Sequence, residues 1–318
     1  MSEIRIIGTL CLLIFLGACQ YSVRTPVNYG ILDPPGISVE VKADTILFSV
    51  IGDYGWMGED TEEVAELVKG WDPDFILTTG DNNYEYGEYA TLHQNIGQFY
   101  GEYIYNFDSP EEYRCKGKAF EEELNRFFPS PGNHDEKGPY DLEPYLNYFS
   151  LPGKEEFYSF SWGPVSFYSI NSLSSADFEE QKAWLAEELE KSNKAFQIVY
   201  FHHAAFSPGR HGDSDHMQWD FHKWGVDLIL AGHDHIYARL EHHQQGGLPY
   251  IINGVGGKSL YYCDEDYDTE GLEVLSCEDE YYGALRCWAD STRMILEFYS
   301  VDYPEEPLDR LEIVREYP

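Results

Sequence analysis

Short apolar runs recur along the first two thirds of the chain and alternate with amphipathic segments. Four of these runs are typical of strands buried on both faces: 45–51, 75–79, 197–201 and 226–231. Two of the segments between them, 60–69 and 176–191, place apolar residues at helical spacing. Strands that alternate with helices predict a largely parallel sheet, at least in the first half of the chain.

The pattern later becomes that of antiparallel strands joined by turns. We expect a hairpin from 157–161 and 165–170, which flank the turn sequence Trp-Gly-Pro. Further strands are expected at 237–242, 250–253, 283–288 and 294–301, and further helical stretches after 81 through about 105, at 116–126 and at 141–148. The segment 261–282 is acidic, aromatic and aperiodic, which indicates an irregular surface insertion.

Length and composition indicate one domain. The chain has 318 residues, of which 43% are hydrophobic and 16% aromatic, and this is ample for one large core. No repeat or long linker divides it. We therefore expect a single domain at 45–303 and a carboxyl-terminal tail at 304–318.

The amino terminus has the pattern of an export signal. An apolar run at 4–16 is short for a membrane span and lies at the very start. The tetrapeptide Leu-Gly-Ala-Cys that ends at Cys19 resembles a bacterial lipobox, in which the cysteine is acylated. We predict a signal peptide at 1–18, a lipid-anchored tether at 19–44, and an exported, membrane-anchored lipoprotein on the periplasmic or cell-surface side. An ordinary signal with a chance cysteine is the alternative.

The charge balance limits the possible partners. With 21 Lys and Arg against 57 Asp and Glu, the formal net charge is -36. Such a surface repels nucleic acid and anionic membranes alike. We expect no nucleic-acid partner and membrane contact only through the lipid anchor, and the oligomeric state stays open.

Four cysteines lie outside the signal and the lipobox: Cys115, Cys263, Cys277 and Cys287. In an exported chain they suggest disulfides, and the absence of a Cys-x-x-Cys element argues against a zinc ribbon. Three pairings are possible, and we favour one bridge within the region 263–287.

Five apolar runs end in short stretches of metal-binding residue types. These contain Asp53, then Asp81 with Tyr84, Asn133 with His134, His202, and His233 with His235. One such residue alone is more often a turn or core polar group, but open α/β folds bind ligands where their strands end, and five such ends suggest a shared site. Asp81 could bridge two cations through its two oxygens. Tyr84 suggests iron, because a phenol binds well only to a strongly acidic metal such as ferric ion.

Taken in this order, the motifs resemble those of the calcineurin-like metallophosphoesterases, over about residues 46–301. The tyrosine three places after Asp81 is similar to that of the purple acid phosphatases. The run Gly-Asp-Asn-Asn-Tyr at 80–84 resembles the small tartrate-resistant type of that family. The resemblance implies an α/β protein, a four-layer α/β/β/α sandwich in one domain, with a dinuclear site where the strands of both sheets end.

The resemblance also implies a role for each residue. Asp53, Tyr84 and His235 would hold a ferric ion, Asn133, His202 and His233 a divalent ion (Fe²⁺, Zn²⁺ or Mn²⁺), Asp81 would bridge the two, and His134 and His211 would face the substrate. The donor types agree, since carboxylate and phenolate suit a trivalent ion, whereas imidazole and amide oxygen suit a borderline divalent one. One departure from the family pattern is Ala204, where a proline is common, and it affects no ligand.

The implied activity is that of an acid phosphatase, a metal-dependent phosphoric monoester hydrolase acting on small-molecule phosphate monoesters. A metal-bound hydroxide would attack phosphorus, and His134 or His211 would protonate the leaving alcohol. A phosphodiesterase or nucleotide pyrophosphatase on the same fold is the alternative, although such relatives mostly lack the equivalent of Tyr84. A non-catalytic surface lipoprotein is a third hypothesis, and the presence of all seven expected ligands speaks against it.

Overall fold

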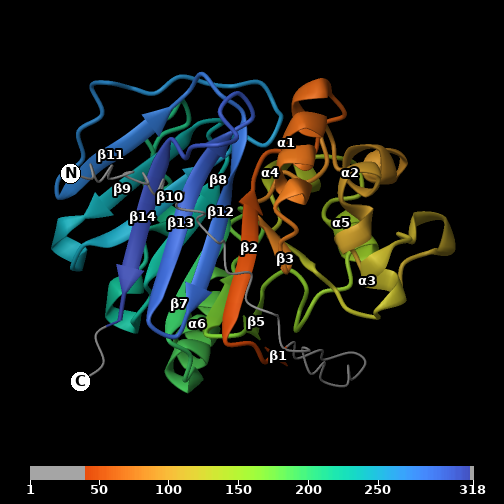
Figure 1. Ribbon diagram of the computed structural model, residues 1–318, viewed down its shortest axis with the longest axis horizontal. Coiled ribbons are helices and arrows are strands. Elements are labelled where there is room, and N and C mark those ends of the chain that lie inside the picture. The colour runs from red at the N-terminus through yellow and green to blue at the C-terminus, as the bar shows by residue number, and fades with distance from the viewer. Residues whose placement is uncertain (1–39, 316–318) are drawn as a thin grey trace, which may run out of the picture.

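Two β-sheets stacked face to face form the centre of the protein in a computed structural model that describes residues 40–315 (Figure 1). The larger sheet has the strand order β1 (Glu40–Val41), β5 (Tyr158–Trp162), β6 (Val165–Ser169), β7 (Phe196–His203), β8 (Leu228–Gly232), β10 (Leu248–Asn253), β9 (Tyr237–His242) and β11 (Leu272–Glu278). The smaller sheet has the order β14 (Asp309–Val314), β13 (Arg293–Ser300), β12 (Gly283–Asp290), β2 (Thr45–Ile51), β3 (Phe75–Thr78) and β4 (Phe127–Pro129).

The parallel strands lie in the middle of the larger sheet and at one side of the smaller one. Strands β6, β7, β8 and β10 run parallel in the larger sheet, and β2, β3 and β4 in the smaller. The remaining strands pair antiparallel, except that the short β1 runs parallel to β5. The predicted parallel core and the predicted hairpin are therefore both confirmed.

Among residues 40–315, two longer helices lie on the outer faces of the sheets, and four shorter ones lie in the connections between strands. They are α1 (Glu59–Gly70), α2 (Gln98–Tyr100), α3 (Lys118–Glu121), α4 (Asn133–Glu136), α5 (Glu143–Tyr148) and α6 (Phe178–Lys191). Helix α1 contacts β12 of the smaller sheet, and α5 lies with it on the side of β2 and β3 in Figure 1. Helix α6 buries Leu185 and Leu189 against the larger sheet, in one cluster with Val199 of β7. The layers are thus helix, sheet, sheet, helix, as the family resemblance implied.

Aromatic rings fill the space between the sheets. Phe75 of β3 lies 5.3 Å from the ring of Phe48 on β2 and 5.2 Å from that of Phe167 on β6, across the interface. All three side chains are fully buried. Burial of large rings is a strong stabilising term, and it fixes the two sheets relative to each other.

Two of the expected helical stretches depart from a regular α-helix. The region after residue 81 is irregular up to residue 88, and from Tyr89 to Tyr103 it is a continuous run of helical turns of changing type: η1 (Tyr89–Thr91), η2 (His93–Gly97), α2 and η3 (Gly101–Tyr103). Asparagine side chains compete there for the backbone, because Asn83 Nδ2 donates to Glu88 O (2.8 Å) and Asn95 Nδ2 to Tyr84 O (2.8 Å). The stretch 116–126 contains only the single helical turn α3. Short helical turns elsewhere in the described residues are η4 (Glu111–Tyr113), η5 (Asp215–Met217), η6 (Phe221–Trp224) and η7 (His243–Gln245).

The structure also differs from the expected boundaries. Part of the expected tail, Asp309–Val314, is strand β14 and pairs with β13, while Glu40–Val41, at the end of the expected tether, pairs with β5. The segment 261–282 lies partly exposed at the surface, as expected of an insertion, but it contains β11, paired antiparallel with β9. The predicted signal peptide, Cys19 and most of the tether lie outside the described residues.

One disulfide is formed within the expected region, between Cys263 and Cys277. Cys115 and Cys287 are free and buried. Within residues 40–315, no helix has the length and apolarity needed to cross a membrane.

Candidate metal centre

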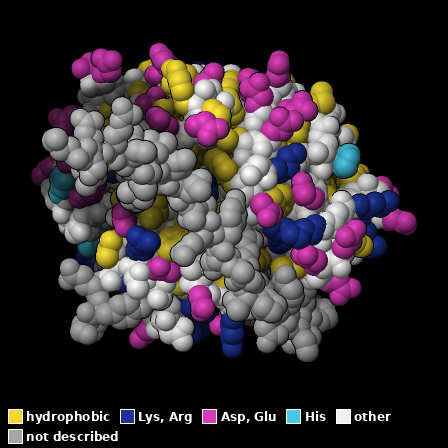
Figure 2. Space-filling view, in the orientation of Figure 1, with side chains coloured by type: hydrophobic (Ala, Val, Ile, Leu, Met, Phe, Trp, Pro, Cys, Tyr) yellow, Lys and Arg dark blue, Asp and Glu magenta, His cyan; other side chains and the backbone are white. Residues whose placement is uncertain are grey.

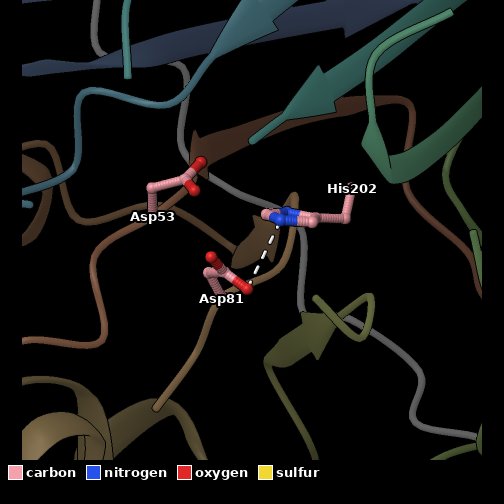
Figure 3. A group of neighbouring side chains, drawn as sticks. All are labelled: Asp53, Asp81 and His202. Atoms are coloured by element: carbon pink, nitrogen blue, oxygen red, sulfur yellow. Dashed lines mark ion pairs between the residues drawn. The ribbon is translucent and has the colours of Figure 1, made fainter. Parts of the chain in front are cut away.

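The carboxyl ends of strands from both sheets converge on one site. Asp53 follows β2, Asp81 follows β3, and the two strands are neighbours in the smaller sheet. His202 lies at the end of β7 in the larger sheet, and His233 follows β8. Ligand atoms of Asp53, Asp81 and His202 all lie within 4.8 Å of one another, and Figure 3 shows the three side chains pointing into one space. The convergence expected from the sequence is therefore observed.

Three of the predicted ligands form one half of the site. The phenol of Tyr84 donates a hydrogen bond to Asp53 Oδ1 (3.1 Å) and lies 3.1 Å from His235 Nε2. His235 Nε2 lies in turn 3.4 Å from Asp53 Oδ1. A carboxylate, a phenol and an imidazole thus meet at one point, in the combination that the sequence assigned to a trivalent ion.

The other predicted ligands form the second half, with Asp81 between the two. His202 Nε2 is 2.9 Å from Asn133 Oδ1 and 3.1 Å from His233 Nδ1. The same nitrogen lies 3.3 Å from Asp81 Oδ1, the contact dashed in Figure 3. The charge of Asp81 also acts on Tyr84 in the first half. All seven predicted ligands therefore lie in one connected cluster.

Backbone carbonyls orient two of the imidazoles. His202 Nδ1 lies 2.9 Å from Thr79 O, and His235 Nδ1 lies 2.7 Å from Ser259 O. Because a carbonyl oxygen can only accept, Nδ1 carries the proton in both rings, and Nε2 is left to coordinate a metal. Hydrogen bonds of this kind are usual for metal-binding histidines, so the donor set fits a cation.

Three of the ligand positions have a backbone conformation that residues other than glycine rarely adopt. Asp53, Asp81 and His233 have φ angles of 53°, 52° and 73°. Left-handed conformations cost free energy outside glycine and cluster at functional sites. Gly232 permits the close approach, because a Cβ atom there would lie 2.6 Å from Asp53 Oδ2. The strand ends are thus shaped to present these side chains.

The charges in the cluster are strongly coupled. Burial alone would raise the pKa of Asp81, but the neighbouring His202 and His134 hold that pKa well below the usual carboxyl range. Burial would lower the pKa of His202, but Asp81 and Asp53 raise it to about 9. Burial and the same two carboxylates raise the pKa of the Tyr84 phenol well above its ordinary value. The protein groups by themselves therefore favour a neutral phenol, and a cation is what could turn it into a phenolate.

The two histidines expected to face the substrate lie at the edge of the cluster. His134 Nε2 is 4.0 Å from Asp81 Oδ2, and its Nδ1 lies 2.8 Å from Glu85 O. His211 is exposed, and its ring stacks on that of His233 with 4.1 Å between centroids. Both imidazoles can therefore reach a molecule bound at the cluster.

Two buried carboxylates support the site, although the sequence motifs do not predict a role for them. Asp135 accepts hydrogen bonds from Gly132 N (2.8 Å) and Asn82 Nδ2 (2.8 Å), and burial together with Asp81 raises its pKa to about 7. Asp234 accepts from Ser207 Oγ (2.5 Å) and from His211 N (2.7 Å). Each follows a predicted ligand or substrate-facing residue directly in the sequence, and this adjacency was the available signal.

The segment after β10 closes one side of the site. Lys258 N donates to Asp53 O (3.1 Å), and the Lys258 ammonium lies over the ring of Tyr84, 4.6 Å from its centroid. Tyr261 N donates to His235 O (3.0 Å), and the Tyr261 ring stacks on His235 at 4.1 Å with an interplanar angle of 11°. Neither residue belongs to a recognisable motif, so the sequence pattern does not indicate a role for them.

A sequence model of the calcineurin-like phosphoesterase family matches residues 46–237, a span that contains all seven residues of the cluster. This chain belongs to the calcineurin-like phosphoesterase family. It is therefore a hydrolase of the phosphoesterase superfamily, a group for which a dinuclear metal site is typical. The family expected from the motifs is confirmed.

Several curated relatives of this phosphoesterase are acid phosphatases. Purple acid phosphatase 17 of Arabidopsis thaliana is 26% identical over 261 residues, which cover 69% of this chain and 70% of that protein. Acid phosphatase type 7 of Mus musculus is 28% identical over 144 residues, which cover 36% of this chain and 32% of that protein. The match to the mouse protein is therefore confined to about a third of either sequence.

Two solved structures share the fold of this phosphoesterase. Purple acid phosphatase PPD1 from yellow lupin (Lupinus luteus) superposes with a TM-score of 0.68 at 18% identity, covering 89% of this chain and 55% of that chain. GAP50, described as the anchor in the inner membrane complex of Plasmodium, gives 0.63 at 17% identity, covering 86% and 90%. Since one is named as an enzyme and the other as an anchor, the fold alone does not decide the activity.

Proposed function

We propose that this phosphoesterase is an acid phosphatase of the purple type, which hydrolyses phosphate monoesters at a dinuclear metal site. The observation that carries the proposal is the position of Tyr84, whose phenol lies 3.1 Å from both Asp53 Oδ1 and His235 Nε2. A tyrosine in this position is what distinguishes the purple acid phosphatases in the sequence pattern. The acid phosphatase names of the relatives support the same class.

The ligand assignment follows the two halves of the cluster. Asp53, Tyr84 and His235 would hold a ferric ion, and Asn133, His202 and His233 a divalent Fe²⁺, Zn²⁺ or Mn²⁺, with Asp81 shared between the two ions. When bound, such a pair supplies positive charge to the phosphoryl oxygens and an activated water for in-line attack.

The chain's own residues would handle the leaving group. The alcohol that departs needs a proton, and His134 and His211 are the two imidazoles at the edge of the cluster. The Nδ1 of His134 is engaged by Glu85 O (2.8 Å), which leaves Nε2 on the side of Asp81. His211 lies on the loop that Asp234 holds through the His211 backbone N–H (2.7 Å). We assign protonation of the leaving alcohol to His211. We place His134 on the side from which the phosphoryl group enters the site.

The test is phosphate release by protein loaded with ferric iron and zinc. We expect hydrolysis of 4-nitrophenyl phosphate at acid pH, faster than that of bis(4-nitrophenyl) phosphate. Asp81→Asn should lose almost all activity together with bound metal, whereas Asp220→Asn, at an exposed carboxylate paired with Lys223, should behave as wild type.

Two results would contradict the proposal in different ways. Faster hydrolysis of the diester would favour the phosphodiesterase alternative. A protein that binds both metals yet releases phosphate from no aryl phosphate between acid and neutral pH would instead favour a non-catalytic surface protein.

A further inference from the structure

We propose that Arg210 and Tyr261 form a subsite for a second anionic group, carried by the leaving alcohol of the substrate. The preferred substrates would then be phosphate monoesters whose alcohol part bears a carboxylate or a further phosphate. This inference rests on the proposed phosphatase function and adds to it the substrate class.

A stack of three side chains places the positive charge next to the metal cluster. The ring of Tyr261 lies parallel to that of His235 at 4.1 Å, so one face of the tyrosine is covered. The guanidinium carbon of Arg210 lies over the Tyr261 ring, 5.1 Å from its centroid. The Tyr261 ring therefore contacts both a predicted metal ligand and the guanidinium of Arg210. Cation–π contacts of this kind orient a guanidinium without using its hydrogen-bond donors.

The subsite lies on the side of the leaving group. The ring of His211, to which we assign protonation of the alcohol, is 5.4 Å from the Tyr261 ring and next to Arg210 in the chain. An alcohol protonated by His211 would therefore extend toward Arg210. A second anion on that alcohol could then accept hydrogen bonds from the guanidinium.

Contacts between two loops hold the stack in place. Asp264 N donates to Pro208 O (2.7 Å), and Tyr267 Oη donates to Asp213 Oδ1 (2.8 Å), so the segment carrying Tyr261 is tied to the loop carrying Arg210. The disulfide from Cys263 begins two residues after Tyr261. A subsite built in advance in this way loses less conformational entropy when it binds.

Arg210 has no carboxylate partner among residues 40–315. It is exposed, and its contact there is the Tyr261 ring. In contrast, Lys258, which lies over the ring of Tyr84, pairs with Glu85. In a chain with 57 acidic and 21 basic residues, a cation beside the site that is left without an acidic partner is available to an anionic ligand.

The test compares substrates that differ only in the second charge. We would measure kcat/KM for 4-carboxyphenyl and 3-carboxyphenyl phosphate against the corresponding uncharged carboxamides. Wild type should prefer the acid in at least one pair by about fivefold, the upper range for an exposed ion pair. Arg210→Gln and Tyr261→Ala should bring the ratio close to one, whereas Arg210→Lys and Tyr261→Phe should retain part of it.

The control variant is Arg293→Gln. Arg293 also lies over an aromatic ring, that of Trp288 at 5.2 Å, but it is at the other end of the smaller sheet, so its loss removes the same net charge far from the site. It should leave the ratio unchanged. A wild type without preference, or an Arg210→Gln variant that keeps the preference while folding normally by thermal unfolding, would overturn the proposal.

A binding measurement separates this inference from the proposed function. Calorimetry on zinc-loaded protein with 4-carboxybenzylphosphonate and its carboxamide gives the same comparison without turnover. About fivefold tighter binding of the acid, lost in Arg210→Gln, would retain the subsite even if neither phosphate ester were hydrolysed. If wild type bound the acid and the carboxamide equally and still hydrolysed aryl phosphates normally, the subsite proposal would be wrong and the proposed phosphatase function would stand.

Discussion

Tyr84 is the residue that separates this cluster from an ordinary group of carboxylates and imidazoles. Its side chain is buried, and burial together with Asp53 and Asp81 raises the pKa of the phenol well above its ordinary value. A nearby strongly polarising cation would oppose both effects, because it stabilises the phenolate. The environment of Tyr84 therefore makes phenolate formation depend on the metal, and this dependence can be measured.

The first prediction concerns colour. Wild type loaded with ferric iron should be violet to pink, because light moves electron density from phenolate oxygen to the metal. Tyr84→Phe removes the oxygen and keeps the ring, so the band should disappear and ferric iron should bind more weakly while the fold survives. Tyr145→Phe is the matched control, since that buried phenol bonds to Pro129 O instead (2.8 Å). A colourless wild type that contains ferric iron in the site would refute the ligand assignment.

The second prediction concerns the proton for the leaving group. His211→Ala should reduce kcat on alkyl phosphates by about a hundredfold or more, the usual contribution of a general acid. The loss on 4-nitrophenyl phosphate should be much smaller, because nitrophenolate leaves without protonation. His243→Ala serves as control, since His243 is exposed and paired with Glu273. Equal losses on the two substrate types would mean that His211 positions substrate or supports the loop.

At the scale of elements, the sequence predicted central strands well and edge strands poorly. Strands such as β2 and β7 read as apolar runs because they are covered on both faces. Strands β1, β11 and β14 are edge strands, half-covered and polar in sequence, so their pattern predicts a tether, an insertion and a tail instead of strands. These edge strands form because they pair with strands that are distant in sequence, and the local pattern of residues does not show such pairing.

The residues of the site also differ in how far local sequence indicates them. The predicted ligands lie at the ends of central strands, where the motif and the strand end are adjacent in sequence. Tyr261 and Lys258 lie on a connection after β10, and they reach the site only because β10 ends beside β8. Their roles depend on tertiary packing, so sequence alone could not assign them.

The third prediction concerns the contact that joins the two sheets at β14. Asp309 accepts two hydrogen bonds from Arg239 of β9 (2.6 and 2.8 Å) and one from Tyr237 (2.8 Å). Both charged side chains are largely buried, at 15% and 10% exposure. Asp309→Asn should therefore lower the free energy of unfolding at neutral pH by about 2 kcal/mol, as expected for charged hydrogen bonds. Urea unfolding of metal-free protein measures this, and Glu312→Gln on the same strand, in an exposed pair with Arg310, should change it by less than about 0.5 kcal/mol.

The effect of Asp309 should depend on pH in a definite direction. Burial alone would raise its pKa, but the hydrogen bonds from Arg239 and Tyr237 hold the pKa below the ordinary carboxyl value. A lowered folded-state pKa stabilises the fold at every pH above the unfolded value of about 3.9, and this contribution is lost as the pH falls through the folded value. The difference between wild type and Asp309→Asn should stay constant from neutral pH to about 5 and shrink below about 4. A difference that grew in acid would contradict the assignment.

The net charge of the whole molecule repels its proposed substrates, which are anions. The formal net charge is -36, and Figure 2 shows acidic side chains spread over the face in view, with basic side chains between them. Phosphate esters and anionic membranes are both repelled by such a surface. Substrate binding would then depend on local positive charge at the site, and any membrane association would require something other than the surface of the domain.

The last prediction addresses that association, and it concerns residues outside those that the structure describes. If Cys19 is acylated, Cys19→Ala should abolish lipid incorporation and move the protein from the membrane fraction to a soluble or unprocessed form. One acyl chain gives marginal binding, and electrostatic repulsion by the domain weakens it further, so the several chains of a lipoprotein would be required. Cys11→Ala is the matched control, because it removes a thiol from the apolar run and leaves the lipobox intact.

Mass spectrometry of the amino-terminal peptide detects acylation, and membrane fractionation measures membrane association. Membrane association that persists without Cys19 would exclude the lipobox interpretation, whereas a wild type that is processed but soluble would favour an ordinary signal peptide.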